Sequence, residues 1–318
     1  MLLNIGIAIL LDLLIGDPPN WPHPVRFIGW VIATIEKWLR AHMKNLYLGG
    51  FYLLIGATFI VLMPIVLMKA IIPPAFFNLI EVYLLYTCLA AKCLTDEAIK
   101  VKASLDRGDL EKARTELSYL VGRDTDGLTQ SEITRGVVET VAENTVDGVL
   151  APLFYMICGA PFGLSVHFAI FYKLVNTLDS MVGYKQAPYT EIGFASAKLD
   201  DLLNFIPARL GAILMIFSGV LAGKNCRHGI RVFLRDRKNH ASPNSGHPES
   251  AVAGLLGIQI GGTNRYFGKP VYKPTIGDAI MPVKPEHITD AAKIMMLSEM
   301  TLYSLAIIVL TALGFNII

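Results

Sequence analysis

Charged residues are scarce in this 318-residue chain, where Asp, Glu, Lys and Arg together make up 17% of the sequence and hydrophobic residues make up 53%. About 25% of the residues of a typical soluble domain are charged. The shortage of charge excludes an ordinary soluble enzyme of this size and indicates that the lipid bilayer is the main solvent of the protein.

Cysteine is also scarce, and its four positions show no paired spacing: Cys88, Cys93, Cys158 and Cys226. Most of them lie in apolar runs, which excludes a disulfide framework and gives no sign of a zinc site. The chain also lacks a Walker A loop, a Rossmann glycine fingerprint, a nucleophile elbow and a zincin motif. Any nucleotide site must therefore be built in another way.

Long apolar runs are present, and three of them reach the roughly 20 residues that a membrane helix needs. They cover residues 51–72, 75–94 and 297–318. The N-terminal run, residues 1–15, is shorter and contains Asp12. Since it lacks a basic flank and a small-residue cleavage site, we expect a retained helix and no signal peptide.

Other apolar segments are broken. Residues 148–171 are interrupted by glycine and proline at 159–163, and residues 211–223 and 250–262 are too short to span alone. A re-entrant hairpin fits such segments as well as a span does, and broken helices at membrane depth must be buried in protein or line a cavity.

The expected fold is thus an all-α polytopic membrane protein with several transmembrane helices, re-entrant or broken apolar segments and cytoplasmic helical loops. We expect one integral membrane domain over residues 1–318, with polar helical insertions at about 95–147 and 224–250.

Charge is unevenly distributed. Residues 96–147 hold 12 of the 26 acidic residues against seven basic ones, whereas residues 224–238 hold six basic residues against Asp236 alone. Short basic loops tend to stay in the cytoplasm. The pattern predicts a multi-pass protein of the cell membrane whose active site faces the cytoplasm.

One helix carries the clearest chemical pattern, and it begins with the capping-box spacing of Thr129 and Glu132. Along it, four charged residues recur at every fourth position: Arg135, Glu139, Glu143 and Asp147. A solvated helix face is the simple interpretation, but such faces usually mix lysine and glutamate in i,i+4 pairs. Stacked carboxylates repel one another unless a cation lies between them, and Mg²⁺ is the counter-ion that we expect.

Three further polar strings lie beside apolar segments. Each has a simple structural interpretation: a lysine and an aspartate that reach the membrane interface, acids at a helix N-terminus, or a rigid turn. The functional alternative is a site for a phosphate-bearing ligand, because charges placed against membrane helices mark functional sites by default. The residues concerned are Lys173, Asn176 and Asp179; Asp200, Asp201, Asn204 and Arg209; and Ser242, Asn244 and Glu249.

Together and in order, these strings resemble the adenosylcobinamide-phosphate synthase family of cobalamin biosynthesis, often called the CbiB/CobD family. The similar strings are Gly16-Asp17-Pro18, Pro22-His23-Pro24-Val25, Val121-Gly122-Arg123-Asp124-Thr125, residues 139–148, Ala151-Pro152-Leu153, Lys173 with residues 176–184, Asp200-Asp201 with Asn204, Pro207-Ala208-Arg209, Ser242-Pro243-Asn244 and Gly261-Gly262. Two positions depart from the family pattern. His247 stands where an aromatic residue, most often tryptophan, is expected, and Thr263 stands where proline is expected.

The resemblance implies a ligase that depends on ATP and Mg²⁺. It would join the free carboxylate of adenosylcobyric acid to the amine of (R)-1-amino-2-propanol O-phosphate, or of ethanolamine phosphate, to give adenosylcobinamide phosphate. Its expected partners are membrane lipid, the corrinoid, the aminoalcohol phosphate and other membrane enzymes of the late cobalamin pathway. No nucleic-acid partner is expected.

The resemblance also implies roles for the polar residues. Glu139, Glu143 and Asp147, and Asp124 as a further candidate, would bind metal; Arg123, Arg135, Lys173 and Arg209 would hold phosphates; Asp179, Asp200 or Glu249 would take the amine proton; and Asn144, Asn176, Asp201, Asn204, Ser242 and Asn244 would bind substrate.

Two alternatives stay open. Aspartates before apolar helices, such as Asp200 and Asp201, are also found in intramembrane Mg²⁺-dependent prenyltransferases, although the acidic strings here do not form a matched pair. The other alternative is a non-enzymatic membrane sensor on the same scaffold. A sensor would be expected to lose acidic groups that this chain keeps at Glu139, Glu143 and Asp147.

Overall fold

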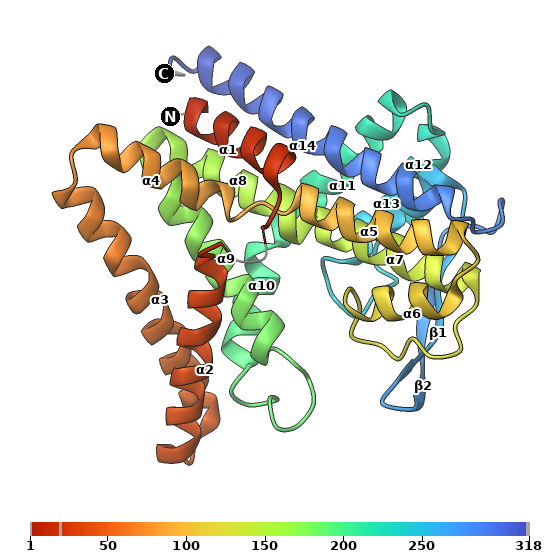
Figure 1. Ribbon diagram of the computed structural model, residues 1–318, viewed down its shortest axis with the longest axis horizontal. Coiled ribbons are helices and arrows are strands. Elements are labelled where there is room, and N and C mark those ends of the chain that lie inside the picture. The colour runs from red at the N-terminus through yellow and green to blue at the C-terminus, as the bar shows by residue number, and fades with distance from the viewer. Residues whose placement is uncertain (1, 19–20, 316–318) are drawn as a thin grey trace. The chain divides into compact units, whose positions relative to one another are not determined.

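The computed structural model describes residues 2–18 and 21–315, and within them it is mostly helical with one antiparallel pair of strands (Figure 1). In chain order the elements are α1 Leu2–Ile15, α2 Pro24–His42, α3 Leu46–Ile71, α4 Pro74–Tyr86, α5 Ala91–Asp106, α6 Leu110–Ser118, α7 Gln130–Asn144, the π-helix η1 Thr145–Leu150, α8 Ala151–Gly159, the 3₁₀-helix η2 Ala160–Phe162, α9 Ser165–Val182, α10 Phe194–Leu203, α11 Phe205–Leu221, α12 Cys226–Asp236, α13 Gly246–Leu256, β1 Ile260–Tyr266, β2 Lys269–Ile276 and α14 Glu286–Ala312.

The chain forms two compact units. The first unit contains Met1–Ala90, Ala151–Asn204 and Tyr303–Ile318, and the second contains Ala91–Leu150 and Phe205–Leu302. Within the first unit, α1 lies beside the C-terminal part of α14, where the Tyr303 hydroxyl donates to the Leu2 carbonyl at 2.9 Å (Figure 1). The expectation of a single integral membrane domain stays a prediction.

Several helices are long and apolar enough to cross a membrane, which confirms the polytopic fold class. Over the described residues there are four of them, and five if the α10–α11 pair, bent by 42°, counts as one span. The other spans are α3, the stretch Pro74–Asp106, the stretch Gln130–Phe162, and α14. The three long apolar runs of the sequence fall largely in these helices, although α3 ends at Ile71 and α14 ends at Ala312. Residues 316–318 lie outside the described part.

The apolar segment 148–171 is resolved into two helices that pack on each other, α8 and α9. Its first half is the end of the long Gln130–Phe162 helix and not a short re-entrant arm. The chain reverses at Gly163, whose φ of 65° is left-handed, and a Cβ at Gly159 would lie 2.6 Å from the Leu164 carbonyl oxygen. The two glycines therefore permit a tight reversal that a larger residue would block.

The segment 250–262 holds the main feature that the sequence did not predict. Helix α13 ends at Gly257, which has a φ of 65°, and β1 then pairs with β2 in an antiparallel hairpin. We call these two strands and their turn the hairpin. Its turn residues Phe267 and Gly268 both have positive φ, at 51° and 76°, as the tightest β-hairpin turns require. Helix α2, which follows the proline-rich loop and begins at Pro24, was not predicted either.

Helix α7 matches the sequence prediction closely. Thr129 and Glu132 form the reciprocal capping box at its start. Its apolar side chains Ile133, Val137 and Val141 are fully buried, so the opposite face is left for polar residues. After Asn144 the helix widens into η1, and this change of helical pitch shifts the register of every later side chain.

Candidate active site

A polar cavity of about 170 Å³ lies in the second unit beside the polar face of α7. It is lined by Leu120, Val121, Gly122, Arg123, Glu139, Thr140, Glu143, Asn144, Glu249, Tyr266 and Lys273. These residues come from the loop before α7, from α7 itself, from α13 and from the hairpin. The cavity therefore gathers three glutamates, an arginine and a lysine from four separate segments.

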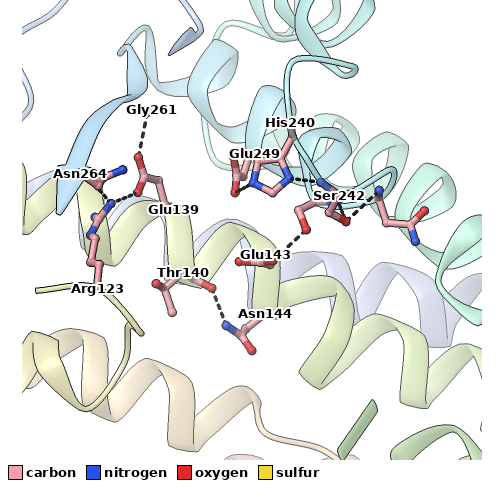
Figure 2. Close-up of polar contacts among 12 residues, drawn as sticks. Arg123, Glu139, Thr140, Glu143, Asn144, His240, Ser242, Glu249, Gly261 and Asn264 are labelled. Atoms are coloured by element: carbon pink, nitrogen blue, oxygen red, sulfur yellow. Dashed lines mark hydrogen bonds and ion pairs between the residues drawn. The ribbon is translucent and has the colours of Figure 1, made fainter. Parts of the chain in front are cut away.

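Glu139 connects α7 to the hairpin and to the preceding loop (Figure 2). Its Oε1 accepts the backbone N–H of Gly261 at 2.8 Å, and its Oε2 accepts Nη1 of Arg123 at 2.9 Å. The same Nη1 donates to Oδ1 of Asn264 at 2.6 Å. Arg123 is buried, and a Cβ at Gly136 would lie 2.4 Å from its Nη2. The helix thus needs glycine at Gly136 to leave room for the guanidinium.

Asp124 holds the turn of the hairpin. Its two carboxylate oxygens accept the backbone N–H groups of Phe267 at 3.1 Å and Gly268 at 2.7 Å, and its own N–H donates to the Arg265 carbonyl at 2.9 Å. A non-glycine residue such as Phe267 adopts positive φ only at some cost. Hydrogen bonds to a carboxylate are stronger than neutral ones and offset this cost. Asp124 therefore fixes the conformation of the hairpin turn through both of its carboxylate oxygens.

Glu143 faces the loop between α12 and α13, residues 237–245. Its Oε1 accepts the Ser245 hydroxyl at 2.8 Å. The loop is shaped by Ser242, whose Oγ accepts the backbone N–H groups of Asn244 at 3.2 Å and Ser245 at 3.3 Å. Asn144, one residue along α7, donates to the Thr140 carbonyl at 3.0 Å. Figure 2 shows the Glu143 side chain extending from α7 toward this loop.

Glu249 is a carboxyl group buried among other carboxylates. Burial raises its pKa well above the ordinary value, and the charges of Glu143 and Glu139 raise it further. His240 Nε2 lies 3.8 Å from its Oε1, but burial lowers the pKa of this imidazole and opposes its protonation. The three carboxyl groups therefore share one cavity, where the cationic groups of Lys273 and Arg123 act against the rise in the Glu249 pKa.

The sequence patterns did not indicate two charged or polar residues of the cavity, Lys273 on β2 and Tyr266 on β1. Burial alone would lower the pKa of the lysine, but Tyr266, Glu249 and Glu139 outweigh that effect and raise it. The ammonium group therefore stays charged inside the cavity. No local motif marked Lys273, because its partners lie on other elements far away in the sequence.

Arg209 lies on α11 in the same unit and reaches the 237–245 loop. Its Nη1 donates to Oδ1 of Asn244 at 3.2 Å and to the Phe205 carbonyl at 2.7 Å, and its guanidinium stacks on the Phe205 ring. His247 is buried at the start of α13, 5.8 Å from the Phe233 ring centroid. Burial, with Arg209 and Arg237, lowers the pKa of His247 to about 4. An uncharged imidazole thus occupies the position where the family resemblance led us to expect an aromatic ring.

Arg135 and Asp147 lie on either side of this cluster along the chain. Arg135 Nε is 3.8 Å from Oε1 of Glu139, and its Nη2 reaches Oδ1 of Asn264 at 3.5 Å. Asp147 lies in η1 and does not line the cavity. Over residues 2–18 and 21–315, no three His, Cys, Asp or Glu side chains are placed to hold a metal together. The metal role of Glu139, Glu143 and Asp147 stays a prediction.

A second group of the predicted residues lies in the first unit. Oδ2 of Asp200 accepts Nδ2 of Asn204 at 3.0 Å, Oδ1 of Asn204 accepts the Tyr172 hydroxyl at 2.9 Å, and Nδ2 of Asn176 lies 3.4 Å from Oδ1 of Asp200. Asp200 and Asn204 are buried, and they are one helical turn apart as predicted. The remaining predicted residues of this unit, Lys173, Asp179 and Asp201, are half-buried on α9 and α10.

Comparison with known proteins adds to this geometry. The family model described as CobD/Cbib protein matches residues 5–295. The cobalamin biosynthesis protein CobD of Geobacter metallireducens is 50% identical over 310 residues, 96% of each chain, and that of Clostridium tetani is 45% identical over 322 residues, 99% of each chain. The protein of the same name from Clostridium perfringens is 50% identical over 283 residues, 87% of this chain and 88% of its own. No solved structure matches the chain. The match over nearly the whole length shows that this chain belongs to the CobD/Cbib protein family.

Proposed function

We propose that this protein acts in cobalamin biosynthesis as a membrane-bound, ATP- and Mg²⁺-dependent ligase. It joins the free carboxylate of adenosylcobyric acid to the amine of (R)-1-amino-2-propanol O-phosphate, or of ethanolamine phosphate, and releases adenosylcobinamide phosphate. The family match supports the pathway. The reaction itself rests on the resemblance described above and on the chemistry of the cavity.

The observation that carries the proposal is the cavity with Glu143, Glu249 and Lys273 on its walls. Amide formation from a carboxylate requires activation, here by transfer of the terminal phosphoryl group of ATP to give an acyl phosphate and ADP. The amine then forms the C–N bond, phosphate leaves, and a base takes the amine proton. Phosphoryl transfer needs positioning and charge stabilisation more than covalent catalysis, and the cavity offers acidic and cationic groups together.

The acidic groups of the cavity suit a divalent cation. Burial is the main cause of the raised pKa of Glu249, and the nearby carboxylates of Glu143 and Glu139 raise it further. Mg²⁺ binds through one or two carboxylates and completes its coordination with water and substrate phosphates. In this proposal Glu143 and Glu139 hold the ion, which when bound polarises the phosphoryl oxygens. Asp147, the last acid of the four-residue pattern, remains a proposed ligand on the sequence pattern and the resemblance.

The chain's own residues supply the remaining functions. Lys273 would bind a substrate phosphate. Arg135, beside Glu139 on α7, and Arg209, beside Asn244 of the 237–245 loop, would bind further phosphate groups. Glu249 is the favoured acceptor of the amine proton, since a carboxyl group with a raised pKa is a better general base near neutral pH. Asn144 and the 237–245 loop, with Ser242 and Asn244, would shape the substrate pocket. Lys173, Asp179, Asp201 and the group around Asp200 remain proposed substrate-binding or proton-accepting residues of the first unit.

A mass-resolved ligation assay tests the reaction. Detergent-purified protein is incubated with adenosylcobyric acid and an equal mixture of the two aminoalcohol phosphates, with and without ATP and Mg²⁺. We expect an ATP-dependent product whose mass identifies the preferred amine. Prenyl diphosphates are offered in a parallel reaction, and a prenylated product there, with no corrinoid amide, would replace the ligase with a prenyltransferase. Absence of any product, with a corrinoid still bound, would favour the sensor.

Glu143→Gln tests the cavity within the same assay. The amide keeps the size of the side chain but loses its charge, so ligation is expected to fall by about a hundredfold or more, as for other groups that stabilise a transition state. Glu111→Gln, on an exposed glutamate of α6, is the matched control and should match the wild type. Turnover by Glu143→Gln at the wild-type rate would remove this residue from the site.

A further inference from the structure

Helix α12 presents an apolar stripe and a basic ridge side by side, away from the cavity described above. The apolar stripe is formed by Cys226, Ile230, Phe233 and Leu234, and it continues onto α11 at Ile213, Ile216, Phe217 and Val220. Together these eight side chains line a groove of about 370 Å³, which we call the α11–α12 groove. Ile230, Leu234, Ile213 and Phe217 are exposed, so the protein itself does not cover it.

The other face of α12 is held against α13. A Cβ at Gly254 would lie 2.9 Å from the Cα of Gly229, so the two backbones touch through glycines. Val232 and Asp236, on the same side of the helix, are buried, and Asp236 accepts the backbone N–H of Gly277 at 2.8 Å. The orientation of the groove is therefore fixed by packing on the opposite side.

The basic ridge runs along the edge of the apolar stripe. Arg227, Arg231 and Arg235 recur every fourth residue and are exposed. Arg235 forms two hydrogen bonds of 2.7 Å with Asp236 and lies 2.9 Å from Asp278. Within residues 2–18 and 21–315, neither Arg227 nor Arg231 has an acidic partner within ion-pair distance. Like charges at i,i+4 repel each other on a helix. An anion bound between these two arginines would reduce that repulsion, and no carboxylate of the described residues does so.

We propose that the α11–α12 groove binds an anionic phospholipid. An acyl chain lies along the apolar stripe, and the lipid phosphate contacts Arg227 and Arg231. Helix α11 belongs to a candidate membrane span, which brings the groove to acyl chains, and helices with one apolar and one basic face lie in the membrane interface. The negative charge of the cytoplasmic leaflet matches the basic ridge. A neutral lipid could place its acyl chain on the apolar stripe but would leave the charges of Arg227 and Arg231 without an anion.

Native mass spectrometry of the full-length protein in detergent tests this inference. The protein is titrated with phosphatidylglycerol or with phosphatidylcholine of the same acyl chains, and retained lipid is counted. We expect phosphatidylglycerol to be retained more strongly, and each removed arginine to weaken it about fivefold, the effect of one basic residue near an anionic surface. Equal retention of the two lipids by the wild type would overturn the proposal without any variant.

Three variants locate the site. Arg227→Gln with Arg231→Gln should reduce phosphatidylglycerol retention about 25-fold if the two effects add. Ile230→Asp, which places a carboxylate in the groove, should reduce it while leaving both arginines. The matched control, Arg107→Gln with Lys112→Gln, removes the same charge from exposed residues of the α5–α6 region and should retain the lipid. Equal losses in the control and in the α12 double variant would show that only net charge matters and would also overturn the proposal.

Discussion

Lys273 illustrates how a single side chain acquires a role from its surroundings. It stands on β2 and lines the cavity, where burial lowers its pKa but Tyr266, Glu249 and Glu139 together raise it above the ordinary value. A charged lysine that is held in place before the substrate binds can stabilise the negative charge of a bound phosphate.

Lys273→Met is therefore expected to lower kcat/KM for ligation by about a hundredfold or more, while Lys273→Arg keeps part of the activity because the positive charge remains. Steady-state kinetics with the aminoalcohol phosphate as the varied substrate measures the effect. Lys269→Met, at an exposed position of the same strand, is the control. Activity of Lys273→Met within about twofold of the wild type would show that the lysine balances charge but contacts no substrate.

His247 gives a prediction about pH. Burial and two nearby arginines lower its pKa to about 4, so the folded protein resists protonating it. The unfolded chain takes up this proton once the pH falls below about 6.5. Stability contributed by the neutral imidazole is therefore present above about pH 6.5 and is lost as the pH falls toward about 4.

His247→Phe removes this titration and keeps a ring against Phe233. Between about pH 8 and pH 5, the wild type should lose up to about 2 kcal/mol more stability than the variant. Thermal unfolding in detergent at both values measures the difference. His42→Phe, at an exposed histidine of α2, should follow the wild type. An equal acid response of the wild type and His247→Phe would show that the buried imidazole does not set it.

At the scale of elements, the helices could be predicted from the sequence because their signals are local. Thr129 and Glu132 are three residues apart and fix the start of α7, and Ile133, Val137 and Val141 fix its buried face. Long apolar runs likewise gave α3 and α14. These patterns need no knowledge of distant parts of the chain.

The hairpin could not be predicted in the same way. Its first strand begins Ile260-Gly261-Gly262, a poor β-strand by composition, and it is held by Glu139 and Asp124, more than a hundred residues earlier in the chain. The candidate site was accordingly predicted in part. Local sequence patterns indicated the polar face of α7, the 237–245 loop and Glu249. No local pattern indicated Lys273 and Tyr266, because they reach the cavity only through the hairpin.

Asp124→Asn tests whether the hairpin positions the cavity. An asparagine can accept one turn N–H group but presents its NH₂ to the other, so one hydrogen bond is lost, the other loses its charge assistance, and the turn loosens. We expect ligation to fall about tenfold, the loss of roughly 1.4 kcal/mol from one such bond, together with faster amide hydrogen exchange at Phe267 and Gly268. Asp126→Asn, at an exposed aspartate two residues away, should change neither. Lower activity with unchanged exchange would assign Asp124 to substrate binding instead of positioning.

At the scale of the whole molecule, charge and apolar length together determine how the chain enters the membrane. In the part of the chain that the structure describes, four or five helices are long and apolar enough to cross, and the basic ridge of α12 follows directly after one of these candidates. The proposed reaction consumes ATP and phosphorylated amines, which are cytoplasmic compounds. From positive-inside bias and substrate supply we therefore expect the hairpin, the cavity and the basic segment 224–238 to lie on the cytoplasmic side.

Cysteine labelling in intact cells tests this orientation. With the four native cysteines replaced by serine, Lys269→Cys in the hairpin and Lys238→Cys after α12 should react with a membrane-impermeant maleimide only after the cells are opened. Lys44→Cys and Phe76→Cys flank α3, so one of them must label in intact cells and the other only in opened ones if α3 spans the membrane. That pair confirms that the reagent distinguishes the two sides. Labelling of Lys269→Cys in intact cells would place the cavity outside the cytoplasm, where ATP is absent. The protein could then not use cytoplasmic ATP, and this result would contradict the proposed ligase reaction.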